Sequence, residues 1–140
     1  MKIHHVAFSV SDIVSSIDWY EKNLGFKKSH GVERDFGTFA LLTNTEGENI
    51  ELIQHPNSLP LPEQRKDLFD DIQQICTKHL ALQVDDIQST LRDLQSNGVE
   101  QVRPIGDAFY DAKYTFIKDP DGNLIVIVEL NKLRIKNEEI

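Results

Sequence analysis

The sequence predicts an α+β fold, in which two copies of one unit form a curved mixed sheet with helices on its outer face. The first observation is a repeat: HHVAFSVSDI at residues 4–13 returns as KHLALQVDDI at residues 78–87, which pairs His5 with His79. The second is periodicity, because each copy reads as an alternating strand followed by a helix. The third is size, since 140 residues suffice for one compact domain with a substantial core. Side by side, the two copies would cover each other's edges, and their inner face would form a cup.

The first half of the chain predicts a strand, a helix and two further strands. These segments are residues 5–10, 12–24, 39–42 and 49–53. The helix has Asp12 or Ser11 as its N-cap and ends before Gly25, a residue suited to the left-handed conformation of a helix terminator. We therefore place the first module at about residues 1–54.

A long connection separates the halves, and the second half repeats the plan. Residues 55–77 begin with three prolines and continue as a polar stretch that predicts partial helix, so they form either a linker or a lid over the cup. The second module covers about residues 78–131, within a single domain of residues 1–131. Its strands fall at residues 80–84, 114–117 and 124–128, with a turn at residues 119–122. Its helix carries Ile87, Leu91 and Leu94 on one face and closes at Asn97-Gly98. The charged tail, residues 132–140, is expected to fray.

Composition excludes several classes of function. The formal net charge of −8 argues against nucleic acid as a partner. No apolar run is long enough to predict a membrane span, and no secretory leader is recognisable. The single cysteine, Cys76, rules out an internal disulfide, and we expect a cytoplasmic protein. The sequence shows no phosphate-binding glycine loop and no Ser/His/Asp pattern with meaningful spacing.

Strand alternation predicts which side chains face the cup. In the first strand Val6, Phe8 and Val10 share the apolar face that would pack on the helices, so His5 points inward, and by the repeat His79 does too. In the strand at residues 49–53 the same argument turns Glu51 inward. Two imidazoles and one carboxylate form the mixed nitrogen and oxygen set that binds a divalent ion such as Zn, Ni, Fe, Co or Mn.

A histidine or carboxylate on a strand is also commonly a plain surface residue. We assign that role to His4, His30 and His55, which are lone histidines. His4 also points to the face opposite His5, and its counterpart in the second copy is Lys78. The repeat is what separates His5 and His79 from this group.

The chain resembles the vicinal oxygen chelate superfamily, the group of glyoxalases, bleomycin-resistance proteins and extradiol dioxygenases. The matching motifs run from Ile3 to about Leu130: HHVAFSVSDI, SSIDWYEKNLGF, NIELI, KHLALQVDDI and DPDGNLIVIVEL. The resemblance implies two tandem βαβββ modules around a metal-bearing cup, small-molecule ligands and commonly a homodimer. It also implies ligands in the first and last strands of each module, at the positions held here by His5, Glu51, His79 and Val126.

Val126 is a departure from the pattern of metal-dependent members, which have glutamate four residues after the DPDG glycine. The internal repeat agrees, because NIELI overlays LIVIV and places Glu51 on Val126. Glu129 lies three residues further on, where alternation points it to the opposite face. The resemblance implies that, in glyoxalase I, this glutamate is a metal ligand and proton-transfer base. Because Val126 stands in its place here, a standard glyoxalase I is not expected.

Two functions remain open. One is a metal-dependent lyase, isomerase or oxygenase acting on a small substrate that chelates through adjacent oxygens, with Glu51 as ligand, base or both. The other is a non-catalytic protein of the bleomycin-resistance type that sequesters a small compound. In either case Val126 would line the pocket. Four further residues would anchor an anionic or aromatic ligand, or are ordinary surface residues: Arg34, Tyr110, Lys113 and Tyr114.

Overall fold

The computed structural model describes residues 1–132 and divides the chain into two compact units. Unit 1 comprises residues 1–80 and 118–124, and unit 2 comprises residues 81–117 and the chain from Ile125 onward. Except for Lys132, the predicted tail lies outside the described residues.

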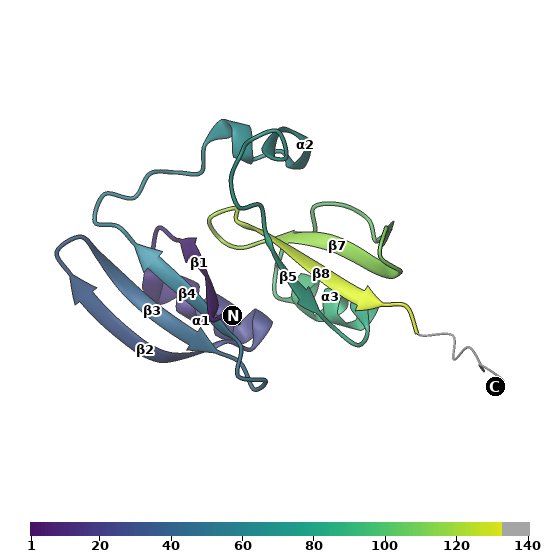
Figure 1. Cartoon of the computed structure of the whole chain (residues 1–140), viewed down its shortest axis with the longest axis horizontal. Helices are drawn as coiled ribbons and strands as arrows, with labels where there is room; N and C mark the ends of the chain where they lie inside the picture. The colour runs from purple at the N-terminus through teal and green to yellow at the C-terminus, as the bar shows by residue number, and fades with distance from the viewer. Residues whose placement is uncertain (133–140) are drawn as a thin grey trace. The chain divides into compact units, whose positions relative to one another are not determined.

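The first sheet lies in unit 1 and contains the predicted strand, helix and two later strands, with the additional strand β2 between the helix and β3 (Figure 1). Its elements are β1 (His5–Ser9), α1 (Ile13–Leu24), β2 (Lys27–Arg34), β3 (Gly37–Thr43) and β4 (Asn49–Gln54). The strands lie in the order β1-β4-β3-β2, with β1 parallel to β4 and β3 antiparallel to both of its neighbours. Helix α1 contacts β2, β3 and β4.

The second module repeats this topology. Its elements are β5 (Leu80–Gln83), α3 (Ile87–Ser96), β6 (Gly106–Ala108), β7 (Ala112–Lys118) and β8 (Leu124–Leu130), and its strands lie in the order β5-β8-β7-β6. The predicted α+β fold is therefore confirmed. The structure refines it in one respect, because strand pairing forms two four-stranded sheets, one from each copy of the repeat.

The two long helices begin and end where local chemistry requires. The Asp12 carboxylate accepts hydrogen bonds from the Val14 and Ser15 amides at 3.1 and 3.2 Å, and Asp86 accepts one from the Ser89 amide at 3.0 Å. Gly25 ends α1 with φ of +72°, a conformation that other residues adopt only at a cost.

Burial in the first sheet agrees with the alternation read from the sequence. Phe8 of β1 and Val10, which directly follows this strand, are buried, as are Ile50 and Leu52 of β4. His5 and the other side chains on its face of β1 are exposed. The apolar face of this sheet therefore belongs to the core, and the face that carries His5 does not.

Strand β8 is buried on both faces from Leu124 to Val128, as its continuous apolar sequence predicts. It lies between β5 and β7 in the second sheet.

The turn before β8 reproduces the turn before β4. The side chain of Asp119 accepts hydrogen bonds from the amides of Asp121 and Asn123, and that of Asn44 accepts equivalent bonds from the amides of residues 46 and 48. Gly122 and Gly47 both have positive φ. The repeat therefore includes the hydrogen bonds of these turns. It shows which residues of β4 and β8 correspond to each other in the two copies.

The turn at residues 118–124 packs within unit 1. The buried Tyr20 hydroxyl of α1 donates a hydrogen bond to Asp119 Oδ2 at 2.9 Å, and Asn123 Nδ2 donates to the Ser9 carbonyl at 3.2 Å. The Ser11 amide also donates to Asp121 Oδ2, at 3.1 Å. These bonds tie the end of β1 and the start of α1 to a turn more than a hundred residues further along the chain.

Two edge strands, β2 and β6, were not predicted from the sequence. Every residue of β2 is exposed, so the strand lacks the apolar alternation that marks a half-buried strand. Strand β6 has only three residues, GDA, which is too short for any pattern. Pairing to β3 and β7 holds these strands, and composition does not reveal them.

The connection between the modules is partly helical, as expected. It contains a 3₁₀ turn at Glu63–Arg65 and the short helix α2 (Leu68–Asp71), which follow the proline-containing stretch. Within residues 1–132, none of the helices has the length and apolarity needed to cross a bilayer.

Candidate functional site

The first sheet brings His5 and Glu51 together. The parallel pairing of β1 with β4 sets Ala7 opposite Glu51 and His5 opposite Asn49, so His5 and Glu51 share one face at a two-residue diagonal. Their side chains meet, with 3.8 Å between His5 Nε2 and Glu51 Oε2. Both are accessible, at 37% and 27% exposure. The predicted inward pair therefore forms a reachable site with one imidazole and one carboxylate.

Neighbouring groups orient the His5 ring. Its Nδ1 lies 2.7 Å from Nδ1 of His4, and the two rings meet edge to face. The backbone carbonyl of His4 accepts a hydrogen bond from Asn49 Nδ2, which links the start of β1 to β4. With Nδ1 occupied in this way, Nε2 is the nitrogen that His5 presents to Glu51.

The spacing of these donors suits a shared metal ion. Two ligands about 2.1 Å from one tetrahedral ion lie about 3.4 Å apart. The observed 3.8 Å between His5 Nε2 and Glu51 Oε2 is close to this value, and a small rotation of either side chain would close the difference. Neutral imidazole nitrogen and carboxylate oxygen are also the donor types that zinc and its neighbours prefer.

His79 immediately precedes β5 and is exposed. Partial desolvation of its ring lowers its pKa below the ordinary histidine value, and the negative charge of Asp71 partly offsets this effect. Its side chain does not lie with His5 and Glu51 in one cluster. Across residues 1–132, no group of three or more His, Cys, Asp and Glu side chains is close enough to hold a metal.

Val126 occupies in β8 the place of Glu51 in β4. The Val10 amide donates to the Ile53 carbonyl at 2.9 Å, and the Val84 amide donates to the Val128 carbonyl at 2.8 Å. Because these bonds are equivalent under the repeat, the residues two positions earlier, Glu51 and Val126, are equivalent as well. Val126 is buried at 3% exposure, so the second copy places an apolar group where the first has a carboxylate.

Glu129 has a structural role that the sequence reading did not identify. Its Oε2 accepts a hydrogen bond from the Ile87 amide at 2.8 Å, at the start of α3. Gln54 Oε1 accepts the equivalent bond from the Ile13 amide at 2.7 Å, at the start of α1. In each copy, a polar residue near the end of the last strand thus caps the helix. Gln54 and Glu129 hold matching positions in the repeat, and this match was the sequence signal for their shared role.

Of the four other residues predicted to bind ligand, one lies on β2 of unit 1 and three lie in or next to β7 of unit 2. Arg34 ends β2 in unit 1, where it is exposed and donates to the Glu33 carbonyl. Tyr110 lies in the β6–β7 turn of unit 2 at 47% exposure. Lys113 and Tyr114 are consecutive in β7 and therefore point to opposite faces. At most one of these two can face any given pocket.

Arg103 is a further cation near this group that the sequence reading did not select. Its guanidinium lies over the Tyr114 ring, 5.4 Å from the ring centroid. It also lines an open groove of about 650 Å³ beside α3, together with Arg92 and Gln101. None of the residues predicted to bind a metal or ligand lines this groove.

Comparison with known proteins agrees with the topology and the motifs. The Glyoxalase/Bleomycin resistance protein/Dioxygenase superfamily model matches residues 2–127. The chain belongs to this superfamily. It is 29% identical over 127 residues to the uncharacterized protein YaeR of Escherichia coli (strain K12), a match that covers 86% of this chain and 90% of YaeR.

Solved structures show the same fold. A glyoxalase family protein from Enterococcus faecalis superposes with a TM-score of 0.77 at 25% identity, covering 91% of this chain and 97% of the other. The trypanothione-dependent glyoxalase I of Leishmania major superposes with a TM-score of 0.71 at 19% identity, covering 92% and 86% of the two chains. The fosfomycin resistance protein FosX of Listeria monocytogenes superposes with a TM-score of 0.67 at 11% identity, covering 94% and 95%. The superfamily's description itself names glyoxalases and dioxygenases beside bleomycin resistance proteins, so membership and fold do not choose between an enzyme and a resistance protein.

Proposed function

We propose that this protein is a metal-dependent enzyme of the glyoxalase superfamily that acts on a small substrate chelating one divalent ion through adjacent oxygens. His5 and Glu51 would supply two of its ligands and His79 the third, which requires His79 to move toward them, since the three do not form one cluster among the described residues. The observation that carries the proposal is the accessible pair of His5 and Glu51, 3.8 Å apart on one face of the first sheet, whose histidine is repeated at His79. The superfamily membership supports the same reading.

A bound divalent ion would polarise the substrate oxygens and stabilise negative charge that develops on them. The part of this chain is to bind the ion and to manage protons. Glu51 is the carboxylate on this face of β4 and is 27% exposed, so it can reach both the ion and a substrate proton. We therefore propose Glu51 as a ligand that also serves as the general base.

Val126 makes a standard glyoxalase I an unsuitable assignment. A positioned general base contributes about 10²- to 10⁴-fold in rate, and the position equivalent to Glu51 in the second module has no such group. We expect slow turnover of the hemithioacetal of methylglyoxal and glutathione with any divalent metal. A kcat/KM of about 10⁶ M⁻¹s⁻¹ or more on this substrate would contradict that expectation.

Metal binding is the test of the proposal. Protein purified without chelators and reconstituted with zinc, nickel, cobalt, iron(II) or manganese should bind close to one ion per chain. His5→Ala and His79→Ala should each lose most of that binding, whereas His30→Ala should retain it, because His30 lies exposed on the edge strand β2. Equal metal content in all four proteins would refute the proposed ligands.

The second candidate is a binding protein that sequesters a small compound without chemistry. The observation that favours it is the apolar, buried Val126 in place of a carboxylate, with Glu129 committed to capping α3. This function predicts ligand binding that is unaffected by removal of metal. We also expect a cytoplasmic homodimer. Contacts to an anionic or aromatic ligand are proposed for Arg34, Tyr110, Lys113 and Tyr114.

A further inference from the structure

The groove beside α3 is formed entirely by residues of unit 2. One of its walls is a single face of the helix, whose members recur at helical spacing: Gln88, Leu91, Arg92 and Gln95. The other wall is the chain at residues 101–105, which leads into β6. A volume of about 650 Å³ lies within the range of sites for small molecules, so the groove is large enough for a ligand.

Hydrogen bonds hold the second wall in place. The Val102 amide donates to the Phe116 carbonyl of β7 at 2.8 Å. Gln95 Nε2 of α3 donates to Gln101 Oε1 at 2.7 Å, which joins the two walls. The wall is therefore fastened both to the sheet and to the helix. A ligand that binds here meets a preformed surface, and this lowers the entropy cost of binding.

Neighbouring groups orient both the side chain and the backbone of Arg103. The guanidinium lies over the Tyr114 ring, 5.4 Å from the ring centroid. The hydroxyl of the buried Thr115 donates to the Arg103 carbonyl at 2.6 Å, and Gln101 Nε2 donates to the same carbonyl at 2.9 Å. A contact with a ring face leaves the N–H groups of the guanidinium able to donate, so Arg103 can bind an anion without leaving the ring.

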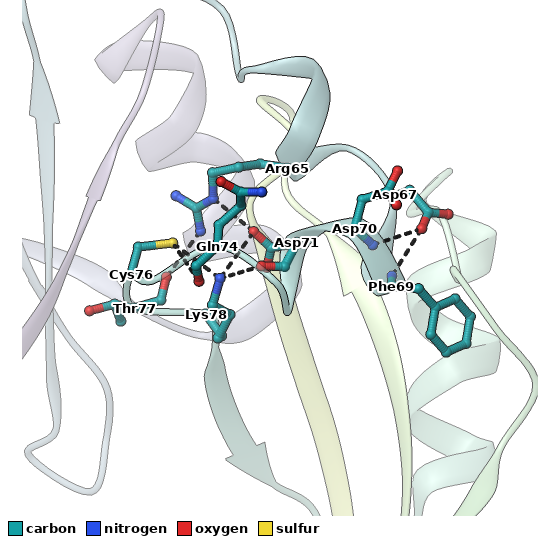
Figure 2. A network of polar contacts seen from close by, with 9 residues as sticks. All are labelled: Arg65, Asp67, Phe69, Asp70, Asp71, Gln74, Cys76, Thr77 and Lys78. Carbon is teal, nitrogen blue, oxygen red and sulfur yellow. Dashed lines mark hydrogen bonds and ion pairs between the residues drawn. The ribbon is translucent and has the colours of Figure 1, made fainter.

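Neither arginine of the groove, Arg92 or Arg103, has a counterion within residues 1–132. The ion pairs in this part of the chain involve other residues, and the groove lining includes neither aspartate nor glutamate. Arg65 shows the contrast, because its Nε donates to Asp71 Oδ1 at 2.9 Å in a network that also contains Lys78 (Figure 2). Two unpaired guanidinium groups that line one groove raise its positive potential, which favours an anionic ligand. The groove thus differs from the chain as a whole, whose formal net charge is −8.

Apolar residues form much of the remaining lining of the groove. They are Leu91, which is 5% exposed, the half-buried Val102 and Ile105, and the exposed Pro104. An oxyanion alone would leave this apolar surface in water, whereas a ligand that also carries an apolar group would cover it. A guanidinium binds carboxylate or phosphate through two parallel N–H···O bonds. The lining therefore fits a molecule that combines an oxyanion with an apolar body.

We propose that the groove beside α3 is a binding site for a small organic oxyanion, a carboxylate or phosphate attached to an apolar group, which Arg92 and Arg103 bind. The apolar group would lie on Leu91 and Ile105. The site is independent of the proposed metal site, because no proposed metal ligand lines the groove. Binding of a carboxylate should need no divalent ion and should not change between about pH 6 and pH 9, since guanidinium groups stay charged throughout.

Titration of metal-free protein with naphthoate, naphthyl phosphate and the neutral naphthylmethanol tests the proposal, with binding followed in ¹H–¹⁵N correlation spectra. At least one anion should bind with a Kd of about 0.1–1 mM, as suits a ligand of this size, and should shift the amide signals of residues 88–95 and 101–105. The anion that binds more tightly identifies the charged group. The alcohol should bind at least about tenfold more weakly. Equal binding of the alcohol, no binding of either anion, or signal shifts confined to residues outside the groove would each overturn the proposal.

Substitution of the two arginines gives the second readout. Arg103→Gln should weaken binding of the anion by about tenfold, and Arg92→Gln, at an exposed position, by about threefold. Lys22→Gln is the matched control, since it removes the same charge from an exposed position at the end of α1, and it should change the affinity by less than about twofold. An equal effect of all three substitutions would mean a general charge effect and would overturn the proposal. The spectra also show whether each variant folds, and if Arg103→Gln does not, Arg92→Gln and the neutral probe decide the question.

Discussion

Replacing Tyr20 with phenylalanine removes one buried hydrogen bond and little else. The Tyr20 side chain is fully buried in α1, and its hydroxyl donates to Asp119 Oδ2 at 2.9 Å. Asn123 Nδ2 donates to the same oxygen at 2.8 Å, so the carboxylate keeps one partner there after the substitution. A hydrogen bond to a charged group is worth about 1.5–3 kcal/mol, and the surviving bond places the expected loss near 2 kcal/mol at neutral pH.

The loss should depend on pH, and its sign follows from Asp119. Burial raises the pKa of the Asp119 carboxyl above its ordinary value, against the lowering effect of hydrogen bonds from Asn123 and Tyr20. A raised folded-state pKa means that the contribution of this carboxyl to stability is fully present below its unfolded pKa and is lost as the pH rises through the folded value. Without the hydrogen bond from Tyr20, the pKa of Asp119 in the folded protein rises further. The variant therefore loses more folding stability than the wild type as the pH rises through that pKa. The free energy of unfolding of Tyr20→Phe should therefore be about 1 kcal/mol lower than that of the wild type where Asp119 is protonated. This difference should grow as the carboxyl ionises.

Urea unfolding of Tyr20→Phe and the wild type between about pH 4 and pH 8 measures this difference. Tyr110→Phe is the matched control, because Tyr110 is 47% exposed, and it should change stability by less than about 0.5 kcal/mol. A loss below about 0.5 kcal/mol that does not vary with pH would refute the argument. It would mean that the turn at residues 118–124 does not depend on α1 for its stability.

Three further substitutions test separate parts of the structure. Val126→Glu should destabilise the metal-free protein by about 3 kcal/mol or more, because it buries an unpaired charge. If residue 126 is the fourth ligand position, as the resemblance implies, the variant should also bind zinc more tightly than the wild type; thermal melts with and without zinc test this, and an unchanged metal response would rule that position out. Glu129→Ala should lower the free energy of unfolding in urea by about 1–2 kcal/mol, because the start of α3 loses its cap, and should leave zinc affinity unchanged. A loss of zinc binding would instead make Glu129 the missing ligand. Gly25→Ala should lower the free energy of unfolding by about 1–2 kcal/mol in the same assay. The loss would come from backbone strain alone, since nothing lies within 4 Å of an added Cβ, and an unchanged stability would argue against a left-handed residue at the end of α1.

The repeat and its alternation were sufficient to predict much of the fold. Both copies of strand, helix and later strands were placed from hydrophobic period, and Asp12 and Gly25 bound α1 as expected. The apolar run from Leu124 to Val128 gave the central strand of the second sheet. These features could be predicted because each is recorded locally, in spacing or in a capping residue.

What escaped prediction depends on partners distant in the sequence. Strand β2 is held by pairing with β3, and its exposed side chains carry no period. Alternation placed Glu129 on the face opposite Val126, whereas its hydrogen bond with the Ile87 amide becomes visible only in the folded chain. Asp71 had no distinguishing pattern, since its burial arises from contacts with Arg65 and Lys78 that the sequence separates by several residues. The pairing of His5 with Glu51 followed from strand parity, whereas nothing in strand parity says how His79 is held.

The difference between the copies also bears on what the proposed site would accept. Two neutral imidazoles and one carboxylate around a divalent ion leave a net charge of about +1, whereas a glutamate at residue 126 would leave it near zero. The surplus charge favours a ligand whose chelating oxygens carry one negative charge, such as a carboxylate beside a hydroxyl or carbonyl. Since valine stands at the position equivalent to Glu51, no second carboxylate from that position would offset the surplus charge. The substitution that argues against a standard glyoxalase I therefore also narrows the substrate class, because a neutral diol would gain less from this ion than a singly charged oxygen chelator.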